Sequence, residues 1–196
     1  MGFVQPSQST AWLGDINGNT VDLQPFTRRV ECEAAYGTAL CKGNVCKLNS
    51  GSLELMAAGN NTVGVILDIC DANGNQFRDN CRPASTAGGA YIFAWQEGIY
   101  LYCYEDGVNG SIDVATNPTG YANLIQAVEG LTGFQTEVTE PTVSVKVDSD
   151  TFSATDTTAE SFHVAVVDTP ANSAFAGTPK RLFRCTPIAA HIETIV

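Results

Sequence analysis

The pentapeptide Asp-x-Asn-Gly-Asn occurs twice in this 196-residue chain, and it limits the possible folds more than any other feature. The two copies are Asp15–Asn19 and Asp71–Asn75, and a further Asn-Gly pair stands at Asn109-Gly110. Asn-Gly supplies the positive φ angles that a type I′ hairpin turn requires at both central positions. We therefore expect these segments to reverse the chain between antiparallel strands.

Short runs of β-branched and aromatic residues lie between these turn signals. Such runs are typical of strands, and one that alternates valine with polar residues should place its valines on one face of a sheet. One run leads directly into the second pentapeptide, as a strand that feeds a hairpin should. The runs cover residues 63–70, 91–95, 99–104, 143–148, 162–167 and 181–185.

Only residues 121–129, between Gly120 and Gly130, suggest a helix. Nine residues make a marginal helix in isolation, so a helix and a non-helical structure are equally compatible with this segment. The chain also contains 18 glycines and eight prolines, which suit frequent turns. The whole pattern predicts an all-β fold, either a β-barrel or a β-sandwich with hairpin turns and at most one short helix.

The first 29 residues differ in composition from the rest of the chain. They are rich in Ser, Thr, Gln, Asn and Gly and contain few long apolar runs. We expect residues 1–29 to form an extended amino-terminal arm that becomes ordered when a partner receives it, and residues 30–196 to form a single β-rich domain. The composition also allows a second lobe after about residue 118.

The charge of the chain argues against a nucleic-acid partner. Ten Lys and Arg against 21 Asp and Glu give a formal net charge of −11, whereas binding to polyphosphate depends on clustered basic residues. No apolar stretch approaches the roughly 20 residues that cross a bilayer. The amino terminus has neither the basic nor the apolar region of a secretory signal. We expect a protein made in the cytoplasm, with no membrane partner.

Seven cysteines stand at positions 32, 41, 46, 70, 81, 103 and 185. An odd number without a secretory signal favours reduced thiols over a disulfide framework. Four residues separate Cys41 from Cys46, and we expect these two side chains to face the core or each other across a hairpin. A structural zinc site would need a second close pair or a neighbouring histidine, so we predict no metal site.

Motifs of the common enzyme classes are absent from the sequence. There is no Gly-x-Ser-x-Gly, phosphate-binding loop or His-Glu-x-x-His motif, and no nucleophile motif accompanies the two histidines, His163 and His191. The pentapeptides resemble the start of an EF-hand loop but lack its glycine at the sixth place and its acidic residue at the twelfth. We predict no catalytic residues and no cofactor, and we favour turns over calcium sites.

The order of segments resembles that of the capsid decoration, or cement, proteins of tailed bacteriophages, in particular those of marine podovirus-like genomes. The resemblance begins with the turn-rich residues 36–51, continues through Ala58-Gly59 and the strand at 63–67, and includes the aromatic run that ends at Glu105-Asp106-Gly107. Residues 117–133 and the late strands follow in the same order, so the resemblance covers about residues 36–191. The seven cysteines depart from the family pattern, and the sequence lacks the longer carboxyl-terminal extension that some fibre-bearing relatives carry.

This resemblance implies a non-enzymatic virion structural protein that binds the outer surface of the expanded major-capsid lattice and stabilises it. Its partners would be the major capsid protein and neighbouring copies of itself. We expect the arm, including Trp12, Leu13 and Phe26, to contact the capsid. The alternative is a β-rich carbohydrate-binding or host-attachment protein of the virion, in which Trp95 or Tyr102 would stack on a sugar.

Overall fold

The computed structural model describes residues 11–106, 119–129, 142–168 and 181–195. These residues form fourteen strands in antiparallel sheets, and the helical elements among them are three short 3-10 turns, Gln24–Phe26, Ser149–Thr151 and Ala189–His191. The sheets are open and packed as in a sandwich, which confirms the predicted all-β fold. No helix in the described part of the chain has the length and apolar character to cross a membrane.

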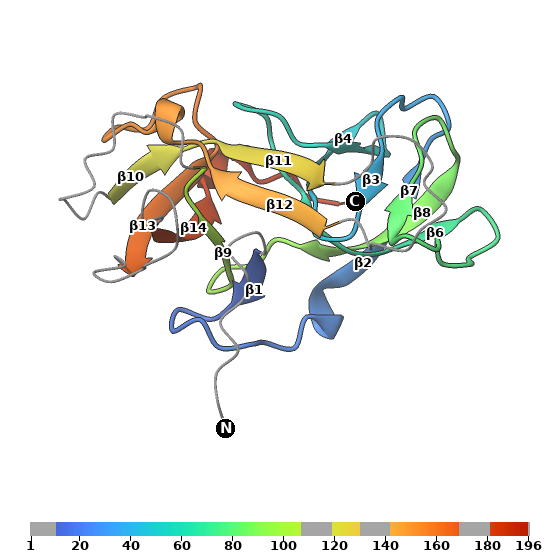
Figure 1. Cartoon of the computed structure of the whole chain (residues 1–196), viewed down its shortest axis with the longest axis horizontal. Helices are drawn as coiled ribbons and strands as arrows, with labels where there is room; N and C mark the ends of the chain where they lie inside the picture. Colours follow the sequence, from blue (N-terminus) through green and yellow to red (C-terminus); the bar gives the residue numbers. More distant parts are fainter. Residues whose placement is uncertain (1–10, 107–118, 130–141, 169–180, 196) are drawn as a thin grey trace.

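Two five-stranded sheets occupy opposite halves of the molecule (Figure 1). The first sheet has the strand order β1 (Trp12–Gly14), β9 (Tyr100–Tyr104), β14 (Leu182–Pro187), β13 (Phe162–Asp168), β10 (Thr119–Ala122). The second has the order β2 (Thr27–Cys32), β8 (Gly88–Ala94), β6 (Gly64–Asp71), β4 (Val45–Asn49), β5 (Ser52–Leu55). Two smaller pairs complete the fold, β11 (Leu124–Glu129) with β12 (Thr142–Val147), and β3 (Leu40–Cys41) with β7 (Cys81–Arg82).

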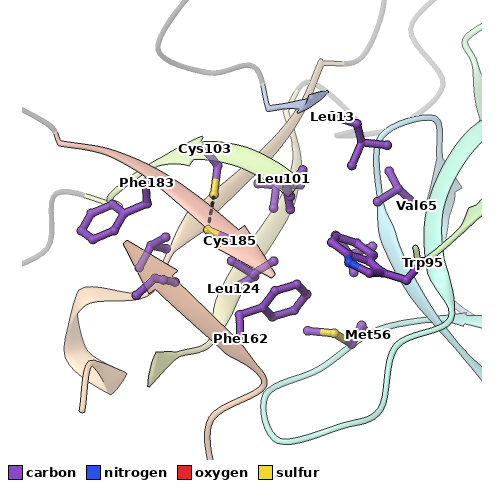
Figure 2. Packing of buried hydrophobic residues seen from close by; sticks show 14 of the residues in the cluster. Leu13, Met56, Val65, Trp95, Leu101, Cys103, Leu124, Phe162, Phe183 and Cys185 are labelled. Atoms are coloured by element: carbon purple, nitrogen blue, oxygen red, sulfur yellow. Dashed lines mark hydrogen bonds between the residues drawn. The ribbon is translucent and has the colours of Figure 1, made fainter. Parts of the chain in front are cut away.

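The second sheet is buried on both faces because its central strands carry apolar residues at successive positions. Val65 and Phe93 belong to one hydrophobic core, while the next residues along each strand, Ile66 and Ile92, belong to another. This alternation follows from the two-residue period of a strand. The first core also contains residues of the first sheet and of β11 and β12, among them Leu124, Phe162 and Phe183, so it joins the two halves of the molecule (Figure 2).

Residues 121–129 contain no helix, and the structure overturns that possibility. They complete β10 and form β11, with a break at Asn123. β10 pairs with β13, and β11 pairs with β12 along its whole length. The Asn123 side chain is buried at the break, where its Oδ1 accepts a hydrogen bond from Ser161 Oγ at 2.9 Å. Pairing with strands far along the chain therefore decided the structure of a segment with weak helical propensity.

Residues 12–29 are part of the folded domain, not of an extended arm. β1 pairs with β9, and β2 begins at Thr27, so the expected boundary at residue 29 falls inside a strand. The reason is burial of apolar side chains. Leu13 belongs to the first core, and the Phe26 ring meets the Phe93 ring edge-on at 6.4 Å between centroids. Residues 1–10 of the expected arm lie outside the described residues.

The cysteines differ from the expected fully reduced set. Cys41 forms a disulfide with Cys81, its direct neighbour across β3 and β7, whereas Cys46 is a buried free thiol. Cys41 and Cys46 are both buried, as one of the two expected arrangements has it, but they do not face each other, because the partner of Cys41 lies 40 residues away in the chain. The four other cysteines are also buried free thiols. Burial raises the pKa of Cys32 to about 11, so this thiol stays protonated at neutral pH.

Candidate functional site: the amino-terminal hairpin

The two pentapeptides form the same turn, which differs from the predicted type I′. Gly18 and Gly74 have φ angles of 79° and 86°, whereas Asn17 and Asn73 do not have positive φ. In each copy the glycine N–H donates to the aspartate carbonyl oxygen at 3.0 Å. The aspartate N–H donates to the carbonyl oxygen of the last asparagine, at 2.9 Å in the first copy and 2.8 Å in the second. This is a three-residue hairpin loop, a type I turn followed by a left-handed glycine.

The aspartate side chains explain this turn type. In both copies Oδ1 accepts hydrogen bonds from the backbone N–H groups two and four residues later, at 2.8 and 2.9 Å. The side-chain amide of Asn19 is the main cause that lowers the pKa of Asp15, and the backbone amide of Asn75 is the main cause for Asp71. Both carboxylates are therefore used within the turn, which favours the turn interpretation over a calcium site.

Contacts from the first sheet hold the first loop in place. Trp12 stacks on Tyr102, with ring centroids 5.1 Å apart and planes 11° from parallel. The Tyr102 hydroxyl donates to the Asp15 carbonyl oxygen at 2.6 Å. From β14, Arg184 Nη1 donates to the Ile16 carbonyl oxygen at 3.1 Å. The loop is thus fixed by two strands as well as by its own hydrogen bonds. We call Trp12–Asn19 the amino-terminal hairpin.

The amino-terminal hairpin exposes an apolar side chain on this rigid loop. Ile16, the first central residue of the turn, is 55% exposed, more than any other large hydrophobic residue that the structure describes. Its carbonyl oxygen is fixed by Arg184, so the backbone of this residue is already ordered before it meets a partner. The arrangement suits insertion of one apolar group into a complementary surface.

The structure places the three predicted contact residues, Trp12, Leu13 and Phe26, at different depths, and their contact with a capsid stays a prediction. Leu13 is buried in the first core, and Phe26 is half-buried against it. Trp12 is half-buried and supports the loop through its stack on Tyr102. Sequence reasoning missed Ile16. The available signal was an isoleucine at the first central position of a turn, where a side chain points away from the hairpin.

The aromatic residues proposed for sugar stacking are inside the protein. Trp95 is 7% exposed and Tyr102 1%, so neither ring offers a face to a ligand in solution. Trp95 instead packs edge-on against Phe93 and Phe162, each with 5.7 Å between ring centroids (Figure 2). The carbohydrate-binding alternative therefore loses the two side chains on which it rested.

A second surface feature is a hollow of about 250 Å³ where the end of β2 approaches the β4–β5 hairpin. Its polar lining includes Glu33, Asn49 and Glu54. Lys47 Nζ lies 3.5 Å from Glu54 Oε2, and Asn49 Nδ2 donates to Glu54 Oε1 at 2.9 Å. The Glu54 carboxylate is therefore already paired. Among the described residues, no group of three or more His, Cys, Asp or Glu side chains could hold a metal ion.

The two histidines also have separate surroundings. The His163 ring makes an edge contact with Tyr121 across the β10–β13 pair, at 5.1 Å between centroids. The His191 carbonyl oxygen accepts a hydrogen bond from Thr62 N at 2.8 Å, which joins the carboxyl-terminal segment to the second half of the molecule.

Comparison with known proteins adds no relative, because no protein-family model, curated protein or solved structure matches this chain.

Proposed function

We propose that this chain is a capsid decoration protein, a non-enzymatic virion component that binds the outer surface of the expanded major-capsid lattice and stabilises it. The order of its segments, which resembles that of such proteins, supports the family. The observation that carries the proposal is the amino-terminal hairpin, which presents Ile16 on a loop fixed by Tyr102 and Arg184. The partners are the major capsid protein and neighbouring copies of this chain.

The physical argument rests on preorganisation and on the number of copies. A loop that is already ordered loses little conformational entropy on docking. Little of the interaction free energy of a small contact is then offset by the cost of ordering the loop. Burial of one isoleucine side chain is worth about 1.5–3 kcal/mol, which is weak for a single molecule. A lattice presents many equivalent sites, and copies that also contact one another gain from multivalency. The net charge of −11 keeps unbound copies soluble and apart.

The test is a pelleting assay with the full chain and with immature and expanded capsids from which the decoration protein has been stripped. We expect saturable binding to expanded shells only, together with a raised temperature of shell rupture. Ile16→Asp should weaken binding at least about tenfold, because it removes the apolar contact and adds a charge that must be desolvated. The variant should keep its fold, since Ile16 is exposed.

Ala72→Asp is the matched control, because Ala72 occupies the equivalent position in the second loop, for which the described residues show no hydrogen bonds like those from Tyr102 and Arg184 to the first. It should bind like the unchanged protein. Failure of the unchanged protein to bind either kind of shell would reject the proposed function. Equal binding by Ile16→Asp and Ala72→Asp would reject the assigned surface while leaving capsid binding in place.

A further inference from the structure

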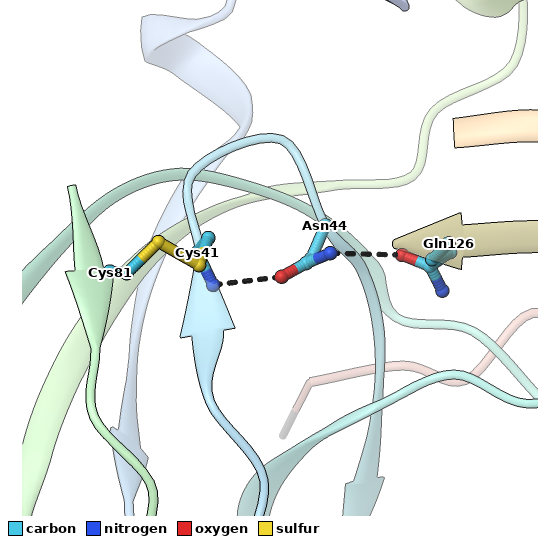
Figure 3. The surroundings of a disulfide bond; sticks show 4 residues. All are labelled: Cys41, Asn44, Cys81 and Gln126. Carbon is cyan, nitrogen blue, oxygen red and sulfur yellow. Dashed lines mark hydrogen bonds between the residues drawn. A yellow bond between two sulfur atoms is a disulfide. The ribbon is translucent and has the colours of Figure 1, made fainter. Parts of the chain in front are cut away.

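The disulfide between Cys41 and Cys81 stands beside the turn that supports the β11–β12 pair (Figure 3). It links β3 and β7, which are two residues long each. Of the two residue pairs between these strands, one is joined by the covalent bond. The next residues, 42–44, form a tight turn that leads into β4. Asn44 N donates to the Cys41 carbonyl oxygen at 3.1 Å and closes this turn.

A chain of hydrogen bonds runs from the disulfide to β11. The buried Asn44 side chain accepts from Cys41 N at 2.8 Å through Oδ1 and donates through Nδ2 to Gln126 Oε1 at 3.5 Å. Gln126 Oε1 also accepts from Val45 N at 2.6 Å. Its Nε2 donates to the carbonyl oxygens of Val45 at 2.9 Å and Met56 at 3.0 Å. The Gln126 amide thus bonds Val45 at the start of β4 and Met56 directly after β5.

The two ends of the β11–β12 pair are held differently. At one end, Leu124 and its partner Val147 are buried in the first core. Farther along the pair, Gln126 is bonded to β4, and Val143 lies against the turn: a Cβ at Gly43 would be 3.5 Å from Val143 Cβ. The far end, which we define as residues 126–128 and 143–145, is therefore held by the turn next to the disulfide as well as by Val145, which is buried in the first core.

We propose that the Cys41–Cys81 disulfide is a redox-controlled latch for the far end of the β11–β12 pair. In the oxidised protein it holds the 42–44 turn in the position that lets Asn44 and Val45 bond Gln126. After reduction the turn loosens and the far end separates from β4. Three backbone hydrogen bonds remain, from Lys42 to Asn80, from Gly43 to Ile66 and from Ile66 to Asn44, so we expect local opening and not unfolding. This inference does not depend on the proposed capsid binding.

A dithiol such as dithiothreitol can reduce this disulfide by thiol–disulfide exchange. One thiolate of the reagent attacks a sulfur of the Cys41–Cys81 bond, forms a mixed disulfide and releases the other cysteine as a thiolate. The second thiol of the reagent then closes the reagent into a cyclic disulfide and releases the remaining cysteine. Two electrons and two protons pass to the protein, and the reagent is oxidised by the same amount. Cys81 is 5% exposed and Cys41 1%, so we expect the first attack at Cys81.

Amide hydrogen exchange of the full chain tests the latch, after mass spectrometry has confirmed the gain of two hydrogen atoms. We expect protection of the far end to fall about tenfold on reduction, the effect of weakening the hydrogen bonds of one buried side-chain amide. Protection of Leu124 and Val147 should not change. Unchanged exchange at the far end in a protein with a fully reduced Cys41–Cys81 pair would overturn the proposal.

Gln126→Ala provides a second test of the latch, because it removes the hydrogen bonds to β4 and leaves the disulfide intact. The far end of this variant should already exchange rapidly when oxidised, and reduction should accelerate it no further. Gln76→Ala is the matched control, because Gln76 also donates a side-chain hydrogen bond, to Asp68 at 2.7 Å, but at the surface and away from β11. It should keep the redox response of the unchanged protein. A Gln126→Ala protein that still responds to reduction would contradict the assigned connection.

Discussion

The loops Asp15–Asn19 and Asp71–Asn75 differ at one residue, and their internal hydrogen bonds agree, but their surroundings do not. The first loop is held by Tyr102 and Arg184, from strands more than 80 positions away in the sequence. The second projects into solvent, and a Cβ at Gly74 would meet nothing within 4 Å. The same local sequence therefore builds the same turn, while the rest of the fold decides whether that turn is fixed to the domain.

This difference is why only the first loop is a candidate contact surface. A turn that is held by its own side chains alone can still move as a unit relative to its sheet. The stack of Trp12 on Tyr102 and the hydrogen bond from Arg184 add fixed points outside the turn. Variants that remove these outside contacts should therefore loosen the first loop alone. Variants that change the turn itself should affect both loops.

The largest expected effect is that of Trp12→Ala. Loss of the stack on Tyr102 and of the half-buried indole should lower the free energy of unfolding by about 2 kcal/mol, as measured by urea denaturation. Hydrogen exchange at residues 15–19 should accelerate, while residues 71–75 should not respond. Phe77→Ala is the converse control, since Phe77 packs against the second core and should leave the first loop unaffected. Equal loosening of both loops by Trp12→Ala would contradict the comparison.

Gly18→Ala and Gly74→Ala test the feature that the two loops share, the left-handed glycine of the turn. Each places a Cβ on a left-handed residue and should cost about 1 kcal/mol of stability. The two costs should be similar, because a Cβ at Gly18 would lie 3.7 Å from the Tyr102 ring, an ordinary contact distance. Gly37→Ala is the control, since Gly37 has no positive φ and open space around it. A loss at Gly37 as large as at Gly18 would disprove the conformational explanation.

The smallest expected effect is a dependence on pH. The pKa values of Asp15 and Asp71 are lowered in the folded state from 3.8, so their contribution to stability is present above pH 3.8 and disappears as the pH falls through the lowered values. Carboxyl resonances followed by NMR should report both titrations. Asn19→Ala should raise the pKa of Asp15 more than Asn75→Ala raises that of Asp71, because the side-chain amide is the main cause only in the first loop. Equal shifts would show that the loops do not differ in this respect.

Strand positions were predictable where the residue pattern is strong. The alternating valines of 143–148 correspond to β12, and the run at 63–70 corresponds to β6, which enters the second loop as expected. Residues 121–129 were not predictable, because their structure depends on pairing with β12 and β13. For the candidate site, the sequence indicated only a region, the expected arm at residues 1–29. Leu13 turned out to be core, and the exposed residue is Ile16.

The all-β class and the two turns at Asp15–Asn19 and Asp71–Asn75 follow from the sequence alone, because strand alternation and Asx-Gly turns depend on residues close together in the chain. Only the tertiary structure decided that Cys41 pairs with Cys81, that Gln126 bonds β4, and that Trp12 supports a loop. Each of these contacts joins residues between 40 and 90 positions apart in the sequence. Their partners are selected by how the sheets pack, and no local pattern specifies that packing.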